Sequence, residues 1–156
     1  MAKKILVAID DSENAMRAVE FVADTFTADN RVTLFNVVQD TATMCEMNSP
    51  ELTPYFTSQQ SSFCLLEDKK RELVDKALKK SKSLLLEAGF VEENIAIKSE
   101  PKKRGVARDI MKEAQSGYNI IVMGKRGVSG IKDFLLGSVS QKVFHLAKDI
   151  SVLFVN

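Results

Sequence analysis

The hydrophobic pattern of this chain switches repeatedly between short apolar runs and stripes at helical spacing. The apolar runs predict buried strands at residues 3–9, 31–38, 120–123 and 151–155. Residues 95–99 alternate apolar and polar side chains, which is typical of a strand at the edge of a sheet. Runs that are apolar throughout favour parallel strands, because helices cover both faces of a parallel sheet.

Between these strands, apolar residues recur every three or four positions and predict helices. The helices are expected at residues 12–26, 65–88, 106–114 and 138–147. This alternation predicts an α/β fold, a doubly wound, largely parallel five-stranded sheet with helices on both faces and right-handed crossovers. The length of 156 residues is most simply explained by a single α/β domain over residues 1–156.

The periodicity disappears between the second strand and the longest helix. Residues 39–62 contain Pro50, Pro54 and several serines and threonines, which predicts a long loop that could include a short helix. Such a loop could cover a ligand, contact a partner subunit or pack against its own domain, and the sequence favours none of these.

Composition excludes several classes of protein. The chain has 22 basic and 21 acidic residues and a net charge of +1, so it offers no broad attraction for nucleic acid or an anionic membrane. No apolar segment approaches the roughly 20 residues that cross a bilayer, and the N-terminus leads directly into a strand. We therefore expect a cytoplasmic protein without nucleic-acid or membrane partners.

Cysteine and histidine are too sparse for metal or triad chemistry. Cys45 and Cys64 do not form a C-x-x-C pair, so reduced thiols are expected, and both should be dispensable. His145 is the only histidine, which excludes a multi-histidine metal centre and leaves a Ser-His-Asp triad without support. A packing or surface role for His145 is favoured, and we assign no catalytic residue and no metal ligand.

The strand at 120–123 opens into a glycine-rich segment that is typical of a phosphate loop. Gly124, Gly127 and Gly137 can adopt positive φ and bring backbone N–H groups close to an anion. Parallel strands bind ligands at their carboxyl ends, where the positive end of the next helix also lies. Lys125 and Arg126 add positive charge beside the loop.

Ser138 follows the last of these glycines and permits two interpretations. Its hydroxyl could donate to a phosphate oxygen. Alternatively, it could cap the helix, because Ser138 and Gln141 have the spacing of a capping box.

The pattern G-x2-G-x9-G-S, formed by Gly124, Gly127, Gly137 and Ser138, resembles the nucleotide-binding signature of the universal stress protein family. The segment Lys4 to Asp10, followed by Asp11-Ser12, resembles the first strand and acidic turn of that family. The resemblance covers nearly the whole chain and places it in the subgroup that binds ATP. It also implies the strand order 3-2-1-4-5.

The resemblance further implies the roles of individual residues. Asp10 would accept a hydrogen bond from a ribose hydroxyl, and the backbone around Val37 would read adenine. Helix capping is an equal alternative for Asp10, with Asp11 sharing the work. The implied ligand is ATP, with AMP or ADP as alternatives, accompanied by Mg²⁺. The complete expected binding set is Asp10, Val37, Met123, Gly124, Arg126, Gly127, Gly137, Ser138 and Val139.

Three functions remain open on these grounds. The leading one is an ATP-binding universal stress protein that acts as a nucleotide-dependent stress-response or regulatory module. A slow Mg-dependent ATP hydrolase is less favoured, because Gly124-Lys125 is followed by Arg126 and not by the Ser or Thr of a Walker A motif. The third is a protein-interaction module with an unoccupied nucleotide site. A homodimer is also expected, paired through the C-terminal strand at 151–155.

Overall fold

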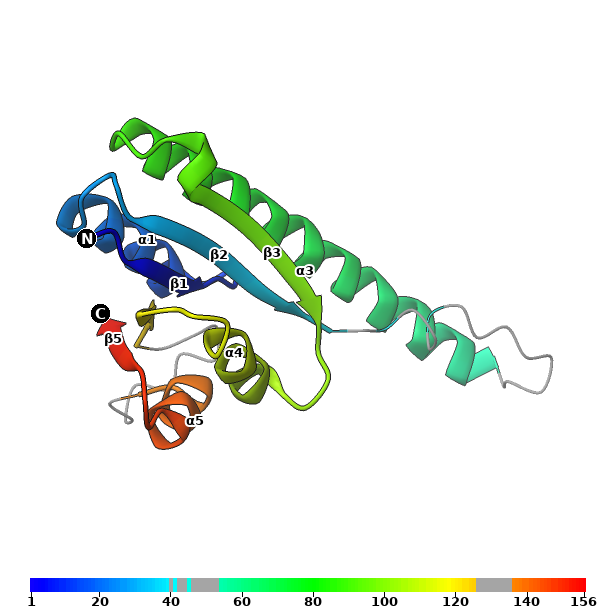
Figure 1. Ribbon diagram of the computed structural model, residues 1–156. Helices are drawn as coiled ribbons and strands as arrows, with labels where there is room; N and C mark the ends of the chain where they lie inside the picture. The colour runs from blue at the N-terminus through cyan, green and yellow to red at the C-terminus, as the bar shows by residue number, and fades with distance from the viewer. Residues whose placement is uncertain (40, 42–44, 46–53, 126–135) are drawn as a thin grey trace.

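The protein is built around one parallel sheet. Figure 1 shows the computed structural model, which describes residues 1–39, 41, 45, 54–125 and 136–156. Five parallel strands lie in the order β3-β2-β1-β4-β5, which confirms the predicted fold class and strand order. The strands are β1 (Lys4–Ala8), β2 (Arg31–Val38), β3 (Ile95–Pro101), β4 (Ile120–Gly124) and β5 (Ser151–Val155).

Helices cover both faces of the sheet. Alternate β1 residues point to opposite faces, so Val7 joins one core cluster and Leu6 joins the other. The first cluster lies under α1 and α3, and the second lies under α4 and α5 (Figure 1). The helices are α1 (Glu13–Thr25), α3 (Pro54–Glu87), α4 (Val106–Ala114) and α5 (Ser138–Leu146), with a short 3-10 helix, η1 (Glu92–Asn94).

The longest helix corrects the prediction for residues 39–62. Helix α3 begins at Pro54 and not at Leu65, so the latter part of the expected loop is helical. Residues 54–66 include no charged side chain and show no clear apolar stripe, which is why periodicity missed them. Of the loop expected at residues 39–62, residues 40, 42–44 and 46–53 lie outside the described residues. Among the helices that the structure describes, none is both long and apolar enough to cross a membrane.

The expectation of reduced cysteines was wrong. Cys45 and Cys64 form a disulfide, with their Cα atoms 5.9 Å apart. The extension of α3 brings Cys64 beside the segment that follows β2, where the backbone N–H of Cys45 donates to the carbonyl oxygen of Thr41 at 2.8 Å. Neither cysteine spacing nor composition reports this proximity, because the pair depends on how α3 lies against the end of β2.

Candidate functional site

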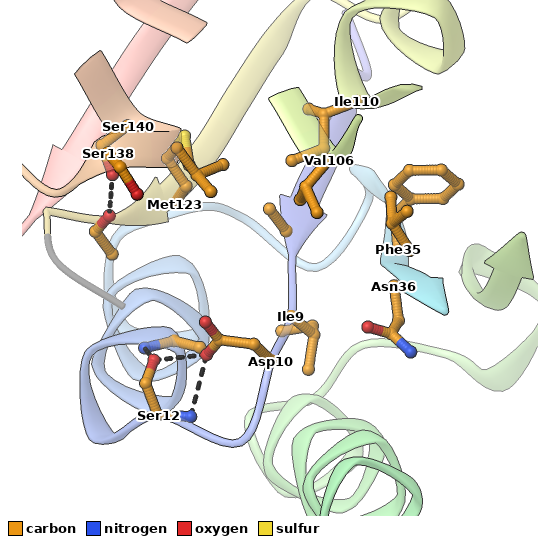
Figure 2. Close-up of a pocket in the computed structure, with 15 residues that line it drawn as sticks. Ile9, Asp10, Ser12, Phe35, Asn36, Val106, Ile110, Met123, Ser138 and Ser140 are labelled. Atoms are coloured by element: carbon orange, nitrogen blue, oxygen red, sulfur yellow. Dashed lines mark hydrogen bonds between the residues drawn. The ribbon is translucent and has the colours of Figure 1, made fainter. Parts of the chain in front are cut away.

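A cavity that we call the main cavity lies at the carboxyl end of the sheet, beside a larger hollow of about 630 Å³ with which it shares part of its lining. The main cavity has a volume of about 240 Å³ and is bordered by the ends of β1, β2 and β4 and by the first turns of α4 and α5. Figure 2 shows Phe35 and Asn36 on the opposite side from Ser138 and Met123. Strands β1 and β4 are neighbours although β2 and β3 lie between them in the sequence, and the cavity opens where the strand order reverses. Its apolar lining includes Phe35, Val37, Val106, Ile110, Met123 and Val139.

Asp10 supplies the carboxylate of the cavity. Its Oδ1 atom accepts hydrogen bonds from the backbone N–H of Ser12, at 2.8 Å, and from the Ser12 hydroxyl (Figure 2). Ser12 is the N-cap of α1, and its Oγ accepts from the N–H of Ala15 at 3.2 Å. Asp10 therefore does not cap the helix itself, which corrects one of its two expected roles. Asp10 instead orients the capping serine and keeps its second carboxylate oxygen at the cavity.

Gly124 is required for a different reason from the one that the sequence suggested. It ends β4, and a Cβ atom there would lie 2.7 Å from the Asn14 Cβ and 2.8 Å from the Asn14 carbonyl carbon. Among the described glycines, positive φ occurs at Gly89, Gly105 and Gly117. The φ of Gly137 is −70°, so the expected positive φ was wrong at both Gly124 and Gly137. Close approach of α1 to β4 explains Gly124.

The start of α5 is tied to the end of β4. Gly137 is the N-cap of α5, Ser138 is its first residue, and no side chain caps the helix, so the predicted capping box was wrong. Instead, the buried Ser140 donates its hydroxyl to the Gly124 carbonyl oxygen at 2.9 Å. The backbone N–H of Gly137 donates to the Lys125 carbonyl oxygen at 2.9 Å. The exposed Ser138 hydroxyl is left available at the cavity.

A buried carboxylate shapes the α4 side of the cavity. Asp109 accepts from the backbone N–H groups of Lys103, at 2.8 Å, and Arg104, at 3.1 Å. Burial by itself would raise the pKa of Asp109, but the amides of Lys103, Arg104 and Gly105 outweigh burial and hold the pKa below its ordinary value. The ionised carboxylate thereby fixes the loop that leads into α4.

Most of the expected binding residues meet at this cavity. Asp10, Val37, Met123, Gly124, Ser138 and Val139 line it, and Gly137 lies beside it as the N-cap of α5. Arg126 and Gly127 lie outside the described residues. Several residues that line the cavity were not predicted from the sequence. Asn36 could have been, because it is a polar residue near the end of an apolar strand. The residues absent from the expected set are Ala8, Ile9, Ser12, Ala15, Phe35, Asn36, Val106, Ile110 and Ser140.

The described residues include no group of three or more histidine, cysteine, aspartate or glutamate side chains that could hold a metal ion. A Mg²⁺ ion that arrives with a nucleotide does not need such a group, because phosphate oxygens and water supply most of its ligands. Asp10 is the one acidic residue among those that line the cavity. The donor set therefore fits a metal bound through a ligand and not an independent metal centre.

Comparison with known proteins shows which family this chain and its architecture resemble. The model of the Universal stress protein family matches residues 1–156. The Bacillus subtilis (strain 168) protein "Universal stress protein YxiE" is 40% identical over 73 residues. That alignment covers 46% of this chain and 46% of the relative, which is about half of each.

Solved structures show the same fold over almost the whole chain. Hypothetical protein MJ0577, the subject of a structure-based functional assignment, is 26% identical with a TM-score of 0.71, covering 99% of this chain and 96% of that one. Universal stress protein UspA from Lactobacillus plantarum is 19% identical with a TM-score of 0.68, covering 99% and 97%. A universal stress protein in complex with cAMP is 17% identical with a TM-score of 0.64, covering 99% and 97%. This chain belongs to the universal stress protein family.

Proposed function

We propose that the protein binds an adenine nucleotide in the cytoplasm and acts as a nucleotide-dependent stress-response module. ATP is the expected ligand, with AMP and ADP as alternatives. The observation that carries the proposal is the composition of the main cavity. Apolar side chains, the Asp10 carboxylate and the first turn of α5 line one cavity, so it offers surfaces suited to a base, a sugar and a phosphate.

The apolar side chains account for the base. Phe35 and Val37 from β2 line the cavity together with Val106 and Ile110 from α4, and Figure 2 shows Phe35, Val106 and Ile110 there. A flat heteroaromatic ring gains free energy when it leaves water for such surroundings. Asn36 adds an amide that can both donate and accept, which is what the polar edge of adenine needs.

The polar groups of the cavity account for the remainder of the nucleotide. One Asp10 oxygen is engaged by Ser12, and the other can accept from a ribose hydroxyl. The first-turn amides of α5 and the Ser138 hydroxyl are donors suited to phosphate, and the helix dipole favours an anion there. Arg126 and Gly127 belong to the same proposed phosphate loop. The cAMP complex of a universal stress protein with this fold supports a nucleotide as the class of ligand.

Binding is favoured over hydrolysis by what lines the cavity. Among the described lining residues, Asp10 is the single group that could act as a base, and hydrogen bonds from Ser12 occupy one of its oxygens. Those bonds orient the carboxylate toward α1. A dedicated ATPase needs a residue that positions the attacking water, and we assign none. Mg²⁺ would neutralise phosphate charge, with Asp10 as the available protein carboxylate.

Calorimetric titration with ATP and Mg²⁺ tests this proposal through Asp10→Asn. The variant retains an oxygen for Ser12 and replaces the second oxygen by an NH2 group, so a ribose hydroxyl loses its acceptor. Affinity should fall at least about tenfold, or about 1.4 kcal/mol. The control is Asp11→Asn, which removes the same charge from a residue that does not line the main cavity.

The ribose contact can be isolated with ligands that lack one hydroxyl. Binding of 2′-deoxy-ATP or 3′-deoxy-ATP should respond less to Asp10→Asn than binding of ATP does, because the contact is already absent. Equal affinity of ATP for the parent and for Asp10→Asn would refute the ribose role. Failure of ATP, ADP and AMP to bind the parent would leave the interaction-module function as the better one. Phosphate release during the titration would instead indicate the hydrolase.

We also propose a homodimer paired through β5, which is an edge strand. The carbonyl oxygen of Val155 accepts a hydrogen bond from the backbone N–H of Lys125 at 2.7 Å, so this oxygen points toward β4. Because backbone groups alternate along a strand, the N–H and C=O groups of Val152 and Phe154 face away from the sheet. The exposed ring of Phe144 lies 6.4 Å from that of Phe154, centroid to centroid, and extends the edge with apolar surface.

Proline at an outward-facing position tests this pairing. Val152→Pro removes one outward N–H without removing a hydrogen bond to β4, and edge strands tolerate such a proline. Light scattering should show a monomer for this variant and a dimer for Val152→Ala, which retains the N–H. A dimer in both variants would exclude β5 from the interface.

A further inference from the structure

Another hollow, which we call the basic groove, lies between the starts of α4 and α5. Its volume is about 200 Å³. Four cationic side chains line it, and no acidic residue is present among the described residues of its lining. The cations are Lys102, Arg104, Arg108 and Lys142.

These four charges lack partners in the part of the chain that the structure describes. None of their side chains makes a hydrogen bond or an ion pair with another described residue. Cations elsewhere are paired: Lys98 lies 2.8 Å from the Glu113 carboxylate, and Lys82 lies 2.8 Å from that of Glu92. Four unpaired like charges around one hollow repel one another, and a bound anion would relieve that repulsion.

The loop that carries two of the cations is held in place before any ligand binds. The N–H of Lys102 donates to the Val38 carbonyl oxygen at 2.7 Å, and Asp109 accepts from the amides of Lys103 and Arg104. Gly105 closes the loop with φ at +125°, a conformation that favours glycine. Asp109 is thus committed to backbone amides and does not neutralise the groove. A fixed loop reduces the entropy lost when its side chains bind a ligand.

The basic groove adjoins the main cavity. Val106, Ser138 and Val139 line both hollows, so a ligand that passes Ser138 can extend from one into the other. The first turns of α4 and α5 both border the groove, and each presents the positive end of a helix dipole. The groove therefore suits a flexible chain with several negative charges better than a single small ion.

We propose that the basic groove binds an oligophosphate. The oligophosphate is either the phosphate chain of a nucleotide held in the main cavity or a free inorganic polyphosphate. The first source rests on the function proposed above, and the second does not. In both, Arg104 and Arg108 make charge-assisted hydrogen bonds to phosphate oxygens, and Lys102 and Lys142 add positive charge.

The test compares three probes on one pair of variants. Adenosine, ATP and inorganic tripolyphosphate are titrated calorimetrically into the parent and into Arg104→Ala/Arg108→Ala at low ionic strength. We expect the double variant to lose at least tenfold in affinity for ATP, tripolyphosphate or both, while adenosine binds as it does to the parent. A loss for ATP alone identifies the nucleotide's own phosphates as the occupant, and a loss for tripolyphosphate alone identifies the free polyphosphate.

Two controls separate this site from general charge. Lys79→Ala/Lys80→Ala removes the same charge from the solvent-exposed surface of α3 and should change each affinity less than threefold. Arg104→Lys/Arg108→Lys keeps the charge and should recover part of the loss. Circular dichroism and thermal melting confirm that each variant is folded, which is expected because both arginines are exposed.

Unchanged affinity of the folded double alanine variant for both ATP and tripolyphosphate would overturn the proposal, and the groove would then be ordinary solvated surface. An equal loss in the Lys79→Ala/Lys80→Ala control would overturn it as well, since net charge alone would explain the effect. If adenosine fails to bind the parent, the proposed nucleotide function is wrong. The tripolyphosphate titration still tests whether the basic groove binds an oligophosphate.

Discussion

The two halves of α3 form the same regular helix in opposite surroundings. Toward its C-terminal end, Leu78 and Leu85 are buried against the sheet in the core cluster shared with α1. Toward its N-terminal end, Leu65 and Leu66 are 67% and 64% exposed, and the helix extends past the strands (Figure 1). The difference shows that burial against the sheet is not what makes the first half helical.

Other contacts hold the projecting half of α3 to the body. The Cys45–Cys64 disulfide joins it to the segment after β2. About two turns further along, Arg71 donates from Nη2 to the carbonyl oxygen of Gln39 at 3.2 Å and to the Thr41 hydroxyl at 3.4 Å. These specific contacts tie this half to a neighbouring chain segment, whereas apolar packing holds the other half.

The largest difference between the halves should come from leucine truncation. Leu85→Ala removes a fully buried side chain and should lower the free energy of unfolding by about 3 kcal/mol, because a cavity remains in the core. Leu66→Ala, at an exposed site in the same helix, should change it by less than about 0.5 kcal/mol. Urea denaturation measures both variants. Comparable losses would mean that the projecting half is packed after all.

Loss of the disulfide should have the next largest effect. The bridge closes a loop with a sequence separation of 19, for which chain entropy sets an upper limit of roughly 3 kcal/mol. Because removal of the bridge also raises the freedom of the projecting half in the folded state, Cys45→Ser/Cys64→Ser should cost less than about half of that limit.

Hydrogen exchange can locate the effect of the missing disulfide. Exchange should accelerate in residues 54–66 and remain unchanged near Leu85. A dithiol reductant should reproduce this result in the parent by converting the disulfide to two thiols, with the reductant oxidised in exchange. Uniform acceleration along α3 would show that the two halves unfold together.

Arg71→Ala should have a smaller and more local effect. Removal of its hydrogen bonds to Gln39 and Thr41 should cost about 1 kcal/mol, the typical net value for such bonds. The neighbouring Lys70→Ala removes a similar charge without those contacts and serves as the control. Thermal melting measures both variants, and an equal change in the two would assign the effect to charge alone.

The smallest effect concerns the exposed ion pair of the packed half. A hydrogen bond from Lys82 and its positive charge hold the pKa of Glu92 below its ordinary value. Glu92 therefore binds its proton less tightly in the folded state, so its stabilising contribution is complete above the unfolded pKa and is lost as pH falls through the folded pKa. An NMR titration should show the carboxylate pKa rising toward 4.5 in Lys82→Ala. Exposure to solvent keeps the effect on stability small.

The sheet was predictable because strand patterns are local and strong. The boundaries of β2 and β5 agree with those expected from their apolar runs, and the exposed Ile97 of β3 agrees with an edge position. The start of α3 was not predictable, because residues 54–66 neither bury an apolar stripe nor carry the charges that mark a solvated helix.

The candidate site was predictable where resemblance or strand position located a residue. Asp10 and Ser138 follow from the ends of a strand and the start of a helix, and both line the main cavity. Val106 and Ile110 were assigned only to a helix stripe, since the pattern of α4 does not reveal that part of that stripe faces a ligand cavity. Ser140 was missed because its partner, the Gly124 carbonyl group, becomes a neighbour only when α5 returns to β4.

The sequence by itself determined the order of strands and helices, because hydrophobic periodicity records which side chains must leave water. Tertiary structure decided the relations between distant segments. It assigned Gly124 to the close approach of α1, paired Cys45 with Cys64, and brought Arg104 and Lys142 to one groove. These outcomes depend on distances between segments that are far apart in the sequence, and local patterning does not encode such distances. A steric clash, a disulfide and a cluster of like charges each require two segments to lie close together in the fold.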